Sequence, residues 1–303
     1  MRWTDGRARR LYNHFMHATP TAPAAPYRGR VAPSPTGLLH IGHACTFWTA
    51  YQRALAQDGT LVFRNEDLDP QRSKAKFAEA MLEDLRWLGI RWQEGPDVGG
   101  MFAPYEQSRR REFYLAAWRS LRNGGFVYPC TCSRKDLATA AAAPNEGDDE
   151  PRYSGRCRTR IREAAQHETP EGVNWRFLVP DGEEIQFDDR HLGPERFVAG
   201  EDFGDLVIWR RDDVPAYQLT VVVDDAAMQI TEVVRGADLL KSTARQLLLI
   251  RALGLPSPAY YHCDLVRDEA GERLAKRHDA LSLRRLREQG YSPQQVLNMC
   301  TSG

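Results

Sequence analysis

Two histidines spaced three residues apart are the side chains in this sequence best suited to phosphate chemistry. They close the segment 33–43, which reads PSPTGLLHIGH. If a helix begins near His40, then His40 and His43 lie on one face of its first turn. The N-terminus of a helix binds phosphate, and imidazoles can donate hydrogen bonds to phosphoryl oxygens. Gly42 leaves room for a flat ring to approach the backbone. This context indicates nucleotide activation, although an isolated pair of this spacing is usually a surface or capping pair.

Three further side chains have the chemistry to bind an amino acid. Glu66 lies in the segment 64–69, RNEDLD, directly after an expected strand. Ligands bind at the carboxyl edge of α/β sheets, and a carboxylate there can hold an ammonium group. Tyr217 and Arg235 flank an apolar stretch, and arginine suits the fork-like binding of a carboxylate. Taken alone, Glu66 fits a surface turn, Tyr217 a core residue and Arg235 a structural ion-pair partner.

Cysteine spacing predicts a zinc site. Cys130, Cys132 and Cys157 supply three thiols, and a structural zinc needs four ligands. Chemistry alone makes His167 the default fourth ligand, and three buried free thiols are the alternative. Because no export signal precedes them, we expect a reducing compartment in which cysteines stay free or bind metal. The other three are expected to be structural thiols: Cys45, Cys263 and Cys300.

The apolar periodicity predicts alternating helices and strands. Helical spacing is expected over 74–89, 106–123 and 238–253, with a last helix that begins near Ser282. Buried strands are expected at 60–64, 206–209 and 219–223, and short strands at 175–179 and 184–187. This alternation favours a mostly parallel sheet. An Ala-rich and then acidic stretch, 138–151, is typical of a linker.

Composition excludes several classes of protein. The 303 residues carry 41 basic and 41 acidic side chains, which is unlike a strongly basic, non-specific nucleic-acid binder. No apolar run approaches the length of a membrane span, so we expect no membrane partner and a cytoplasmic location. Residues 1–26 are expected to be a poorly ordered extension.

The segment 33–43 resembles the HIGH signature of class I aminoacyl-tRNA synthetases, in the form found in the glutamyl family. A second segment, 273–277 (RLAKR), resembles the KMSKS signature of the same class, although only its second lysine, Lys276, is kept. The resemblance covers roughly residues 27–290. The stretch around Tyr217 and the Tyr-x-x-x-Cys pattern at Tyr153 resemble the short glutamyl-Q family in particular.

The resemblance implies roles for individual residues. His40, His43 and Lys276 would be catalytic, and the same three with Gly42 would bind ATP. Tyr153 would replace His167 as the fourth zinc ligand. Glutamate would be bound by a set of residues from both halves of the catalytic domain: Arg30, Val31, Ala32, Pro33, Ser34, Glu66, Tyr217 and Arg235.

For the reaction, the resemblance implies activation of L-glutamate by ATP and Mg²⁺ without tRNA. The glutamyl group would then pass to the queuosine base in the anticodon of tRNA(Asp), with one structural Zn²⁺ and a monomeric enzyme. A truncated glutamyl-tRNA synthetase that charges the 3′ end, and a non-catalytic tRNA-binding paralogue, remain as alternatives.

The resemblance also implies the domain organisation. We expect a Rossmann-like class I catalytic domain with an inserted zinc-binding acceptor-type subdomain, a short C-terminal helical segment and no anticodon-binding domain. The expected boundaries are 27–125 and 201–260 for the two halves of the catalytic domain, 126–200 for the insertion, and 261–303 for the KMSKS-like loop and C-terminal helices.

Overall fold

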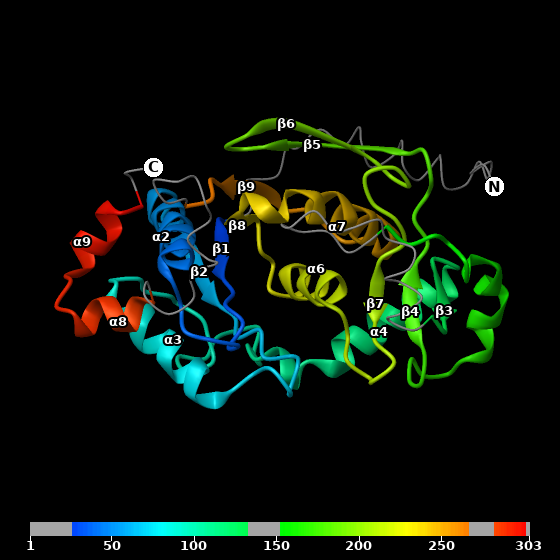
Figure 1. The fold of residues 1–303 in the computed structure, drawn as a ribbon, viewed down its shortest axis with the longest axis horizontal. Helices are drawn as coiled ribbons and strands as arrows, with labels where there is room; N and C mark the ends of the chain where they lie inside the picture. The colour runs from blue at the N-terminus through cyan, green and yellow to red at the C-terminus, as the bar shows by residue number, and fades with distance from the viewer. Residues whose placement is uncertain (1–25, 133–151, 267–281, 301–303) are drawn as a thin grey trace.

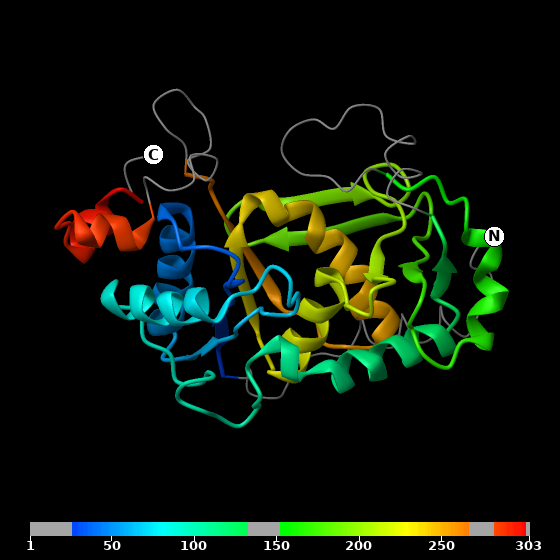
Figure 2. The same ribbon diagram turned by 60° about the horizontal axis from the view of Figure 1, so that its bottom comes forward.

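The computed structural model of the chain describes residues 26–132, 152–266 and 282–300. Most of the expected N-terminal extension, the expected linker at 138–151 and the loop that carries Lys276 lie outside the described residues. In the views of Figures 1 and 2, β1, β2 and α2 lie toward one end of the molecule and β3 and β4 toward the other. The helices α6 and α7 lie between these two groups.

Parallel strands form the centre of the fold. β1 (Arg28–Val31) pairs in parallel with β2 (Thr60–Phe63), and β8 (Glu232–Gly236) pairs in parallel with β9 (Ala259–Cys263). Thr231 joins the two pairs, because its backbone N–H donates to the Arg28 carbonyl over 2.9 Å. A hairpin of β5 (Glu184–Asp189) and β6 (Gly193–Val198) extends the β8–β9 pair, since Asp189 pairs with Tyr260 of β9. The expectation of an α/β fold is confirmed. These strands pair in parallel except for the antiparallel hairpin of β5 and β6.

Helices cover this sheet at the places that the apolar spacing predicts. The expected helices over 74–89, 106–123, 238–253 and after Ser282 are all present. Their bounds, with the short 3-10 turns, are α2 (Ile41–Ala56), α3 (Ala75–Trp87), η1 (Gln107–Arg109), α4 (Arg111–Asn123), η3 (Ala237–Leu239), α7 (Leu240–Leu253), α8 (Leu283–Glu288) and α9 (Pro293–Asn298).

The prediction of a strand at 219–223 is wrong. These residues belong to a helix, α6 (Tyr217–Ala227), and every residue from Leu219 to Asp225 in it is buried. A helix enclosed on all sides has no polar face toward solvent, so its sequence lacks the alternation of apolar and polar residues with a period of 3.6 residues. The run Val221–Val223 then has the β-branched composition of a strand, and tertiary contacts override that local preference.

A second, antiparallel sheet lies at the far end of the molecule. It consists of β3 (Val127–Cys130), β4 (Asn174–Phe177) and β7 (Val207–Trp209), in that order. The 3-10 segment η2 (Arg158–Gln166) lies beside it (Figure 1). Three tryptophans of one core cluster, Trp118, Trp175 and Trp209, are completely buried between this sheet and α4.

One cysteine pair corrects the expectation of free thiols. Cys45 of α2 and Cys300, just after α9, form a disulfide between Cα atoms 5.3 Å apart. The pairing has no local signature, because 255 residues separate the two cysteines. It arises because α9 packs on α2 in the second core cluster. None of the described helices is long and apolar enough to cross a membrane.

Candidate active site

A helix, α2, begins directly after His40, as the sequence predicts, and His40 and His43 cap it. His40 is the N-cap residue of α2, and its Nδ1 accepts a hydrogen bond from the Gly42 backbone N–H over 3.1 Å. The Nδ1 of His43 accepts from the His40 backbone N–H over 3.3 Å. Burial, reinforced by His40, lowers the pKa of His43 to about 3. Each Nδ1 is therefore an acceptor, which places the proton of a neutral ring on Nε2. The Nε2–H groups are the donors with which this pair can bind a phosphate.

Gly42 has a more specific role than the sequence suggests. A Cβ at this position would lie 3.1 Å from Cε1 and 3.2 Å from Nδ1 of His40. The flat ring that approaches the glycine backbone is thus the imidazole of His40. Because the Gly42 N–H already binds this ring, it is not available to a phosphate.

Glu66 lies in a buried network at the carboxyl end of β2. Its Oε1 accepts from Nη2 of Arg64 over 3.0 Å, and Arg64 Nη1 donates to Asp225 over 2.6 Å. The Arg64 side chain is fully buried, and 8% of the Glu66 side chain is exposed. Burial raises the pKa of Glu66, and Arg64 opposes that effect. One oxygen of Glu66 is held by Arg64, so the second can accept from a substrate ammonium.

Arg30 reaches the same network from β1. Its Nη1 donates to the Val234 carbonyl over 2.6 Å, and its Nε lies 3.7 Å from Asp225. That Nε is buried and has no hydrogen-bond partner among the described residues. Burial lowers the pKa of Arg30, while Asp225 acts against this shift. A buried guanidinium with an unsatisfied donor is a binding site for an anion.

Tyr217, the first residue of α6, joins this group. Its pKa is raised by burial and is affected by the charges of Arg235, Glu66, Arg30 and Asp225. The residue nevertheless keeps 38% of its surface exposed. The exposed part of Tyr217 is therefore the side of its ring that borders an opening, while its hydroxyl group is removed from solvent and lies near the four charged groups. The structure therefore brings together four predicted residues that lie far apart in the sequence.

Arg235 is held by three neighbours at the end of β8. Its Nη1 donates to Gln246 over 2.9 Å, its Nη2 to Thr243 over 2.6 Å and its Nε to His262 over 3.1 Å. The residue is only 4% exposed. It is a positioned guanidinium with hydrogen-bond partners, rather than the member of a simple ion pair that its sequence context suggests.

The backbone of residues 31–34, which precede the two histidines, is held by hydrogen bonds to the segment 64–66. The carbonyls of Val31 and Pro33 accept from the Arg64 and Glu66 backbone N–H groups over 2.9 and 3.0 Å. These bonds continue the β1–β2 pairing beyond the strand ends and fix the register of Ala32 between them. Ser34 is exposed. The backbone of 31–34 thus runs beside Glu66.

The cluster brings together three guanidiniums and three carboxylates. The guanidiniums belong to Arg30, Arg64 and Arg235. Glu66 and Asp225 lie directly beside Arg64, and Asp189 faces Arg235 through His262. The adjacent pair of Arg110 and Asp224, joined over 2.6 Å, adds no net charge. Charges of both signs are therefore held in a largely desolvated place, where charge is strongly felt.

Several members of this network have no signal in the sequence. Arg64, Asp224, Asp225 and His262 are polar residues that are buried with charged or polar partners. The sequence contains a run of acids at 224–225, but only the helical geometry of α6 turns them toward Arg64 and Arg110. Their burial, which a sequence does not report, is the signal that identifies them.

The predicted zinc ligands also lie together. The sulfur atoms of Cys130, Cys132 and Cys157 lie within 4.8 Å of one another. The hydroxyl of Tyr153 lies 3.5 Å from the Cys130 sulfur and 3.4 Å from the Cys132 sulfur. His167 is not in this cluster; its ring packs against Trp175. Among the described residues, Tyr153 is therefore the better candidate for the fourth position.

The geometry of these four side chains fits a tetrahedral metal. Sulfurs bound to zinc at about 2.3 Å are about 3.8 Å apart, and Cys132 and Cys157 are 3.5 Å apart. Burial raises the pKa of Cys132 to about 11. Burial acts in the same direction on Cys157, but hydrogen bonds, led by that with Tyr153, lower its pKa to about 7. The donor set suits Zn²⁺, and a metal would hold all three sulfurs as thiolates.

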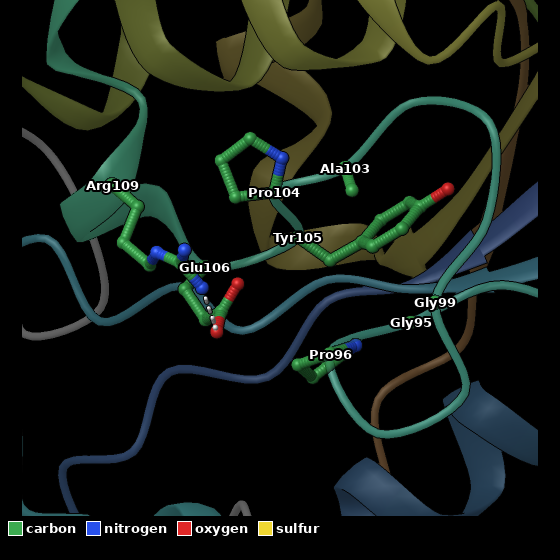
Figure 3. A pocket seen from close by; sticks show the side chains of 8 residues that line it. All are labelled: Gly95, Pro96, Gly99, Ala103, Pro104, Tyr105, Glu106 and Arg109. Atoms are coloured by element: carbon green, nitrogen blue, oxygen red, sulfur yellow. Dashed lines mark hydrogen bonds and ion pairs between the residues drawn. The ribbon is translucent and has the colours of Figure 1, made fainter.

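A surface cavity of about 290 Å³ lies apart from the predicted residues. Figure 3 shows Glu106 paired with Arg109 at this cavity, with Tyr105 and Pro104 nearby. The backbone of Tyr105 pairs with Asn65, which precedes Glu66. The cavity contains none of the predicted site residues in its lining.

The mixed α/β fold that carries this site is that of the class I tRNA synthetases. The chain belongs to the family described as tRNA synthetases class I (E and Q), catalytic domain, whose pattern matches residues 27–302, and it is a ligase.

Two curated relatives are similar over most of their length. A glutamyl-Q tRNA(Asp) synthetase of Nitratidesulfovibrio vulgaris is 48% identical over 87% of this chain and 82% of the relative. The enzyme of the same name from Symbiobacterium thermophilum is also 48% identical, over 89% of this chain and 84% of the relative. A crystal structure of the glutamate-tRNA synthetase of Elizabethkingia anophelis superposes with a TM-score of 0.78 at 28% identity. This superposition covers 92% of this chain and 61% of that one.

Proposed function

We propose that this enzyme activates L-glutamate with ATP, without tRNA, and transfers it to the queuosine base in the anticodon of tRNA(Asp). One observation carries the proposal: Glu66, with one oxygen held by Arg64 and the other left for a ligand, lies at the strand ends in one group with the guanidiniums of Arg30 and Arg235. Glutamate at neutral pH has one ammonium and two carboxylates, which are opposite in charge to these three side chains. The names of the two relatives that are 48% identical support the queuosine acceptor.

In this proposal, each charged group of glutamate has a partner in the cluster. The ammonium binds Glu66, which keeps one oxygen for it, and the Tyr217 hydroxyl lies among the same charges. The carboxylates face Arg30 and Arg235. The backbone of Val31, Ala32 and Pro33, with Ser34, forms the adjoining wall of the site.

The adenylation step needs charge stabilisation at the phosphates. A carboxylate oxygen of glutamate bonds to the α-phosphorus of ATP, and the bond from that phosphorus to the bridging oxygen breaks, which releases pyrophosphate. His40 and His43 donate from Nε2 to the α-phosphate oxygens, and Gly42 allows the capping geometry that directs them. Lys276 and Mg²⁺ neutralise the pyrophosphate. In the second step the acceptor bonds to the acyl carbon of glutamate, the bond from that carbon to the phosphate oxygen breaks, and AMP is released.

The cysteine cluster has a structural role in this proposal. Cys130, Cys132, Tyr153 and Cys157 hold one Zn²⁺ with no open position, so the metal shapes the lobe that meets the acceptor. The remaining proposals are a monomeric enzyme that acts in the cytoplasm and the expected boundaries of its domains.

A labelling experiment tests the acceptor. Purified protein is incubated with ATP, Mg²⁺ and radiolabelled glutamate, together with queuosine-containing tRNA(Asp) or the same tRNA without queuosine. We expect label on the modified tRNA only, and we expect it also on modified tRNA from which the 3′-terminal adenosine has been removed. Pyrophosphate exchange that depends on glutamate but not on tRNA reports the first step. Absence of exchange with and without tRNA would instead identify a non-catalytic paralogue.

A second candidate function is glutamylation of the ordinary 3′ end. It is favoured by the similarity to the glutamate-tRNA synthetase structure, which superposes on 92% of this chain with a TM-score of 0.78. In that case both tRNAs are labelled, and removal of the 3′-terminal adenosine beforehand abolishes the labelling.

A further inference from the structure

His262 is a buried histidine on β9 that connects Arg235 to an acid on another strand. Its side chain is fully buried. Its Nδ1 lies 2.6 Å from Oδ2 of Asp189, and its Nε2 lies 3.1 Å from both Nε of Arg235 and Oγ1 of Thr243. The chain of contacts therefore runs from β5 through β9 to the guanidinium on β8.

Asp189 is held so that it can only accept a hydrogen bond from His262. Its Oδ1 accepts from three backbone N–H groups, those of His191, Leu192 and His262, over 3.0 to 3.2 Å. Burial would raise the pKa of Asp189, but these hydrogen bonds and that of the His262 ring lower it. The carboxylate is thus ionised, and its Oδ2 faces His262.

This arrangement determines the tautomer of His262. An ionised carboxylate has no proton to donate, so Nδ1 of His262 must carry the hydrogen. Burial, together with Arg235, lowers the pKa of His262 to about 4, so the ring is neutral. Its Nε2 therefore has a lone pair, and Arg235 Nε–H and the Thr243 hydroxyl point at it.

The groups around His262 come from every neighbouring element. Asp189 belongs to β5 and Arg235 to β8, while Thr243 belongs to α7; Tyr260 of β9 stacks near the ring at 6.2 Å, and the charge of Arg30 on β1 also acts on it. The three hydrogen bonds that Arg235 makes within the described part of the chain use three of its five N–H donors. The remaining two can bind a carboxylate as a fork.

We propose that Asp189 and His262 are positioning residues for substrate binding: Asp189 fixes the tautomer in which His262 accepts from Arg235, and this holds the guanidinium in the orientation that binds glutamate. The proposal rests on the proposed function, in which Arg235 binds a carboxylate of glutamate. Neither residue touches the substrate in this scheme.

The substitution Asp189→Asn tests the tautomer directly. The three backbone donors keep an oxygen at the Oδ1 position, so the amide nitrogen must face His262. It then donates to Nδ1 and moves the histidine proton to Nε2, where it opposes Arg235 Nε–H. We expect KM for glutamate in pyrophosphate exchange to rise by about tenfold or more, with KM for ATP unchanged.

Two substitutions of His262 separate positioning from stability. His262→Gln can place an acceptor near the position of Nε2, whereas His262→Asn keeps a donor for Asp189 but loses contact with Arg235. We expect the asparagine variant to raise KM for glutamate and the glutamine variant to restore most of the affinity. Tyr261→Phe changes the neighbouring residue of β9 and removes its hydrogen bond with His191, which lies between β5 and β6. It is the matched control and leaves both KM values unchanged.

The KM values for glutamate and ATP are measured by pyrophosphate exchange with total tRNA present. Thermal unfolding is measured for each variant, and ¹⁵N NMR shows which tautomer of His262 is present. We expect Nδ1–H in the wild type, Nε2–H in Asp189→Asn, and no added effect of Asp189→Asn once His262 is glutamine. An unchanged KM for glutamate after the tautomer has moved, or an equal effect in both backgrounds, would overturn the proposal. If the wild type shows no glutamate-dependent exchange at all, the proposed function fails, and the NMR result still decides whether Asp189 fixes the tautomer.

Discussion

The two histidines of α2 use one nitrogen each to cap the helix, and this determines what the other nitrogen can do. Because His40 Nδ1 binds the Gly42 N–H and His43 Nδ1 binds the His40 N–H, both rings present Nε2. The spacing of three residues is thus a structural requirement as well as a catalytic one. A change in the capping geometry would change the direction of both donors.

Gly42→Ala is expected to impair adenylation. The new Cβ would contact the His40 ring at 3.1 Å, so the ring must move away from its capping position. We predict a fall of about tenfold or more in the rate of glutamate-dependent pyrophosphate exchange, with little change in KM for glutamate. Gly37→Ala is the matched control, since no atom lies within 4 Å of a Cβ there. Equal rates for the two variants would contradict this account of Gly42.

The predicted residues of the site could be found because their motifs are local or resemble a family. His40, His43 and Glu66 lie in short recognisable segments, and Tyr217 and Arg235 came from the resemblance. Asp225 and His262 could not be found in this way. Their roles come from contacts across 161 and 27 residues, with Arg64 and Arg235 respectively, and a single sequence contains no record of those contacts.

At the level of elements, the sequence predicted amphipathic helices well and the enclosed helix badly. α4 has an apolar stripe and was expected at its observed place, whereas α6 is buried on every side and was expected as a strand. The difference matters for the site, because α6 places Tyr217 at its first turn and Asp224 and Asp225 two turns later. A strand over the same residues would alternate these side chains between two faces.

The cysteine cluster joins β3 to the segment before η2, and its metal content can be measured. We expect about one zinc per chain in the purified protein by elemental analysis. Cys157→Ser removes a ligand and is expected to lower the zinc content to less than about a tenth of that value. Cys263→Ser, a free cysteine outside the cluster, is the control and keeps the metal. Equal zinc content in the two variants would show that the cluster is a set of thiols without a metal.

At the scale of the molecule, the disulfide joins α2 to the end of α9 and closes a loop of 255 residues. Loop-closure entropy gives such a bond up to about 5 kcal/mol of stability. We predict that tris(2-carboxyethyl)phosphine lowers the free energy of unfolding of the wild type but not of Cys300→Ser. Cys263→Ser retains the sensitivity of the wild type. A wild type that is insensitive to reductant would show that the bond does not form in solution.

The buried histidines predict a stability that falls in acid. The pKa values of His43 and His262 are about 3 and about 4 in the native state, below the ordinary 6.5. The unfolded chain therefore binds these protons first, and the native state loses stability as the pH falls from 6.5 toward 4.

The contribution of His262 can be isolated by urea unfolding at two pH values. Between pH 6.5 and pH 5, each histidine accounts for about 2 kcal/mol. We predict that His262→Gln loses about 2 kcal/mol less than the wild type over this range. Tyr261→Phe serves as the control and shows the full loss. If His262→Gln and the wild type lose the same amount, His262 is not buried as a neutral ring.

The interlocked charges also have a consequence for protein engineering. A synthetase re-aimed at an uncharged amino acid cannot be made by deleting Arg64 alone, because that deletion leaves Glu66 and Asp225 buried without the cation that binds both. Cations and anions must be exchanged together, in matched pairs, as with Arg64 and Asp225. Libraries that randomise one position at a time would then return misfolded proteins, whereas libraries that vary a guanidinium together with its acid could reach new amino-acid substrates.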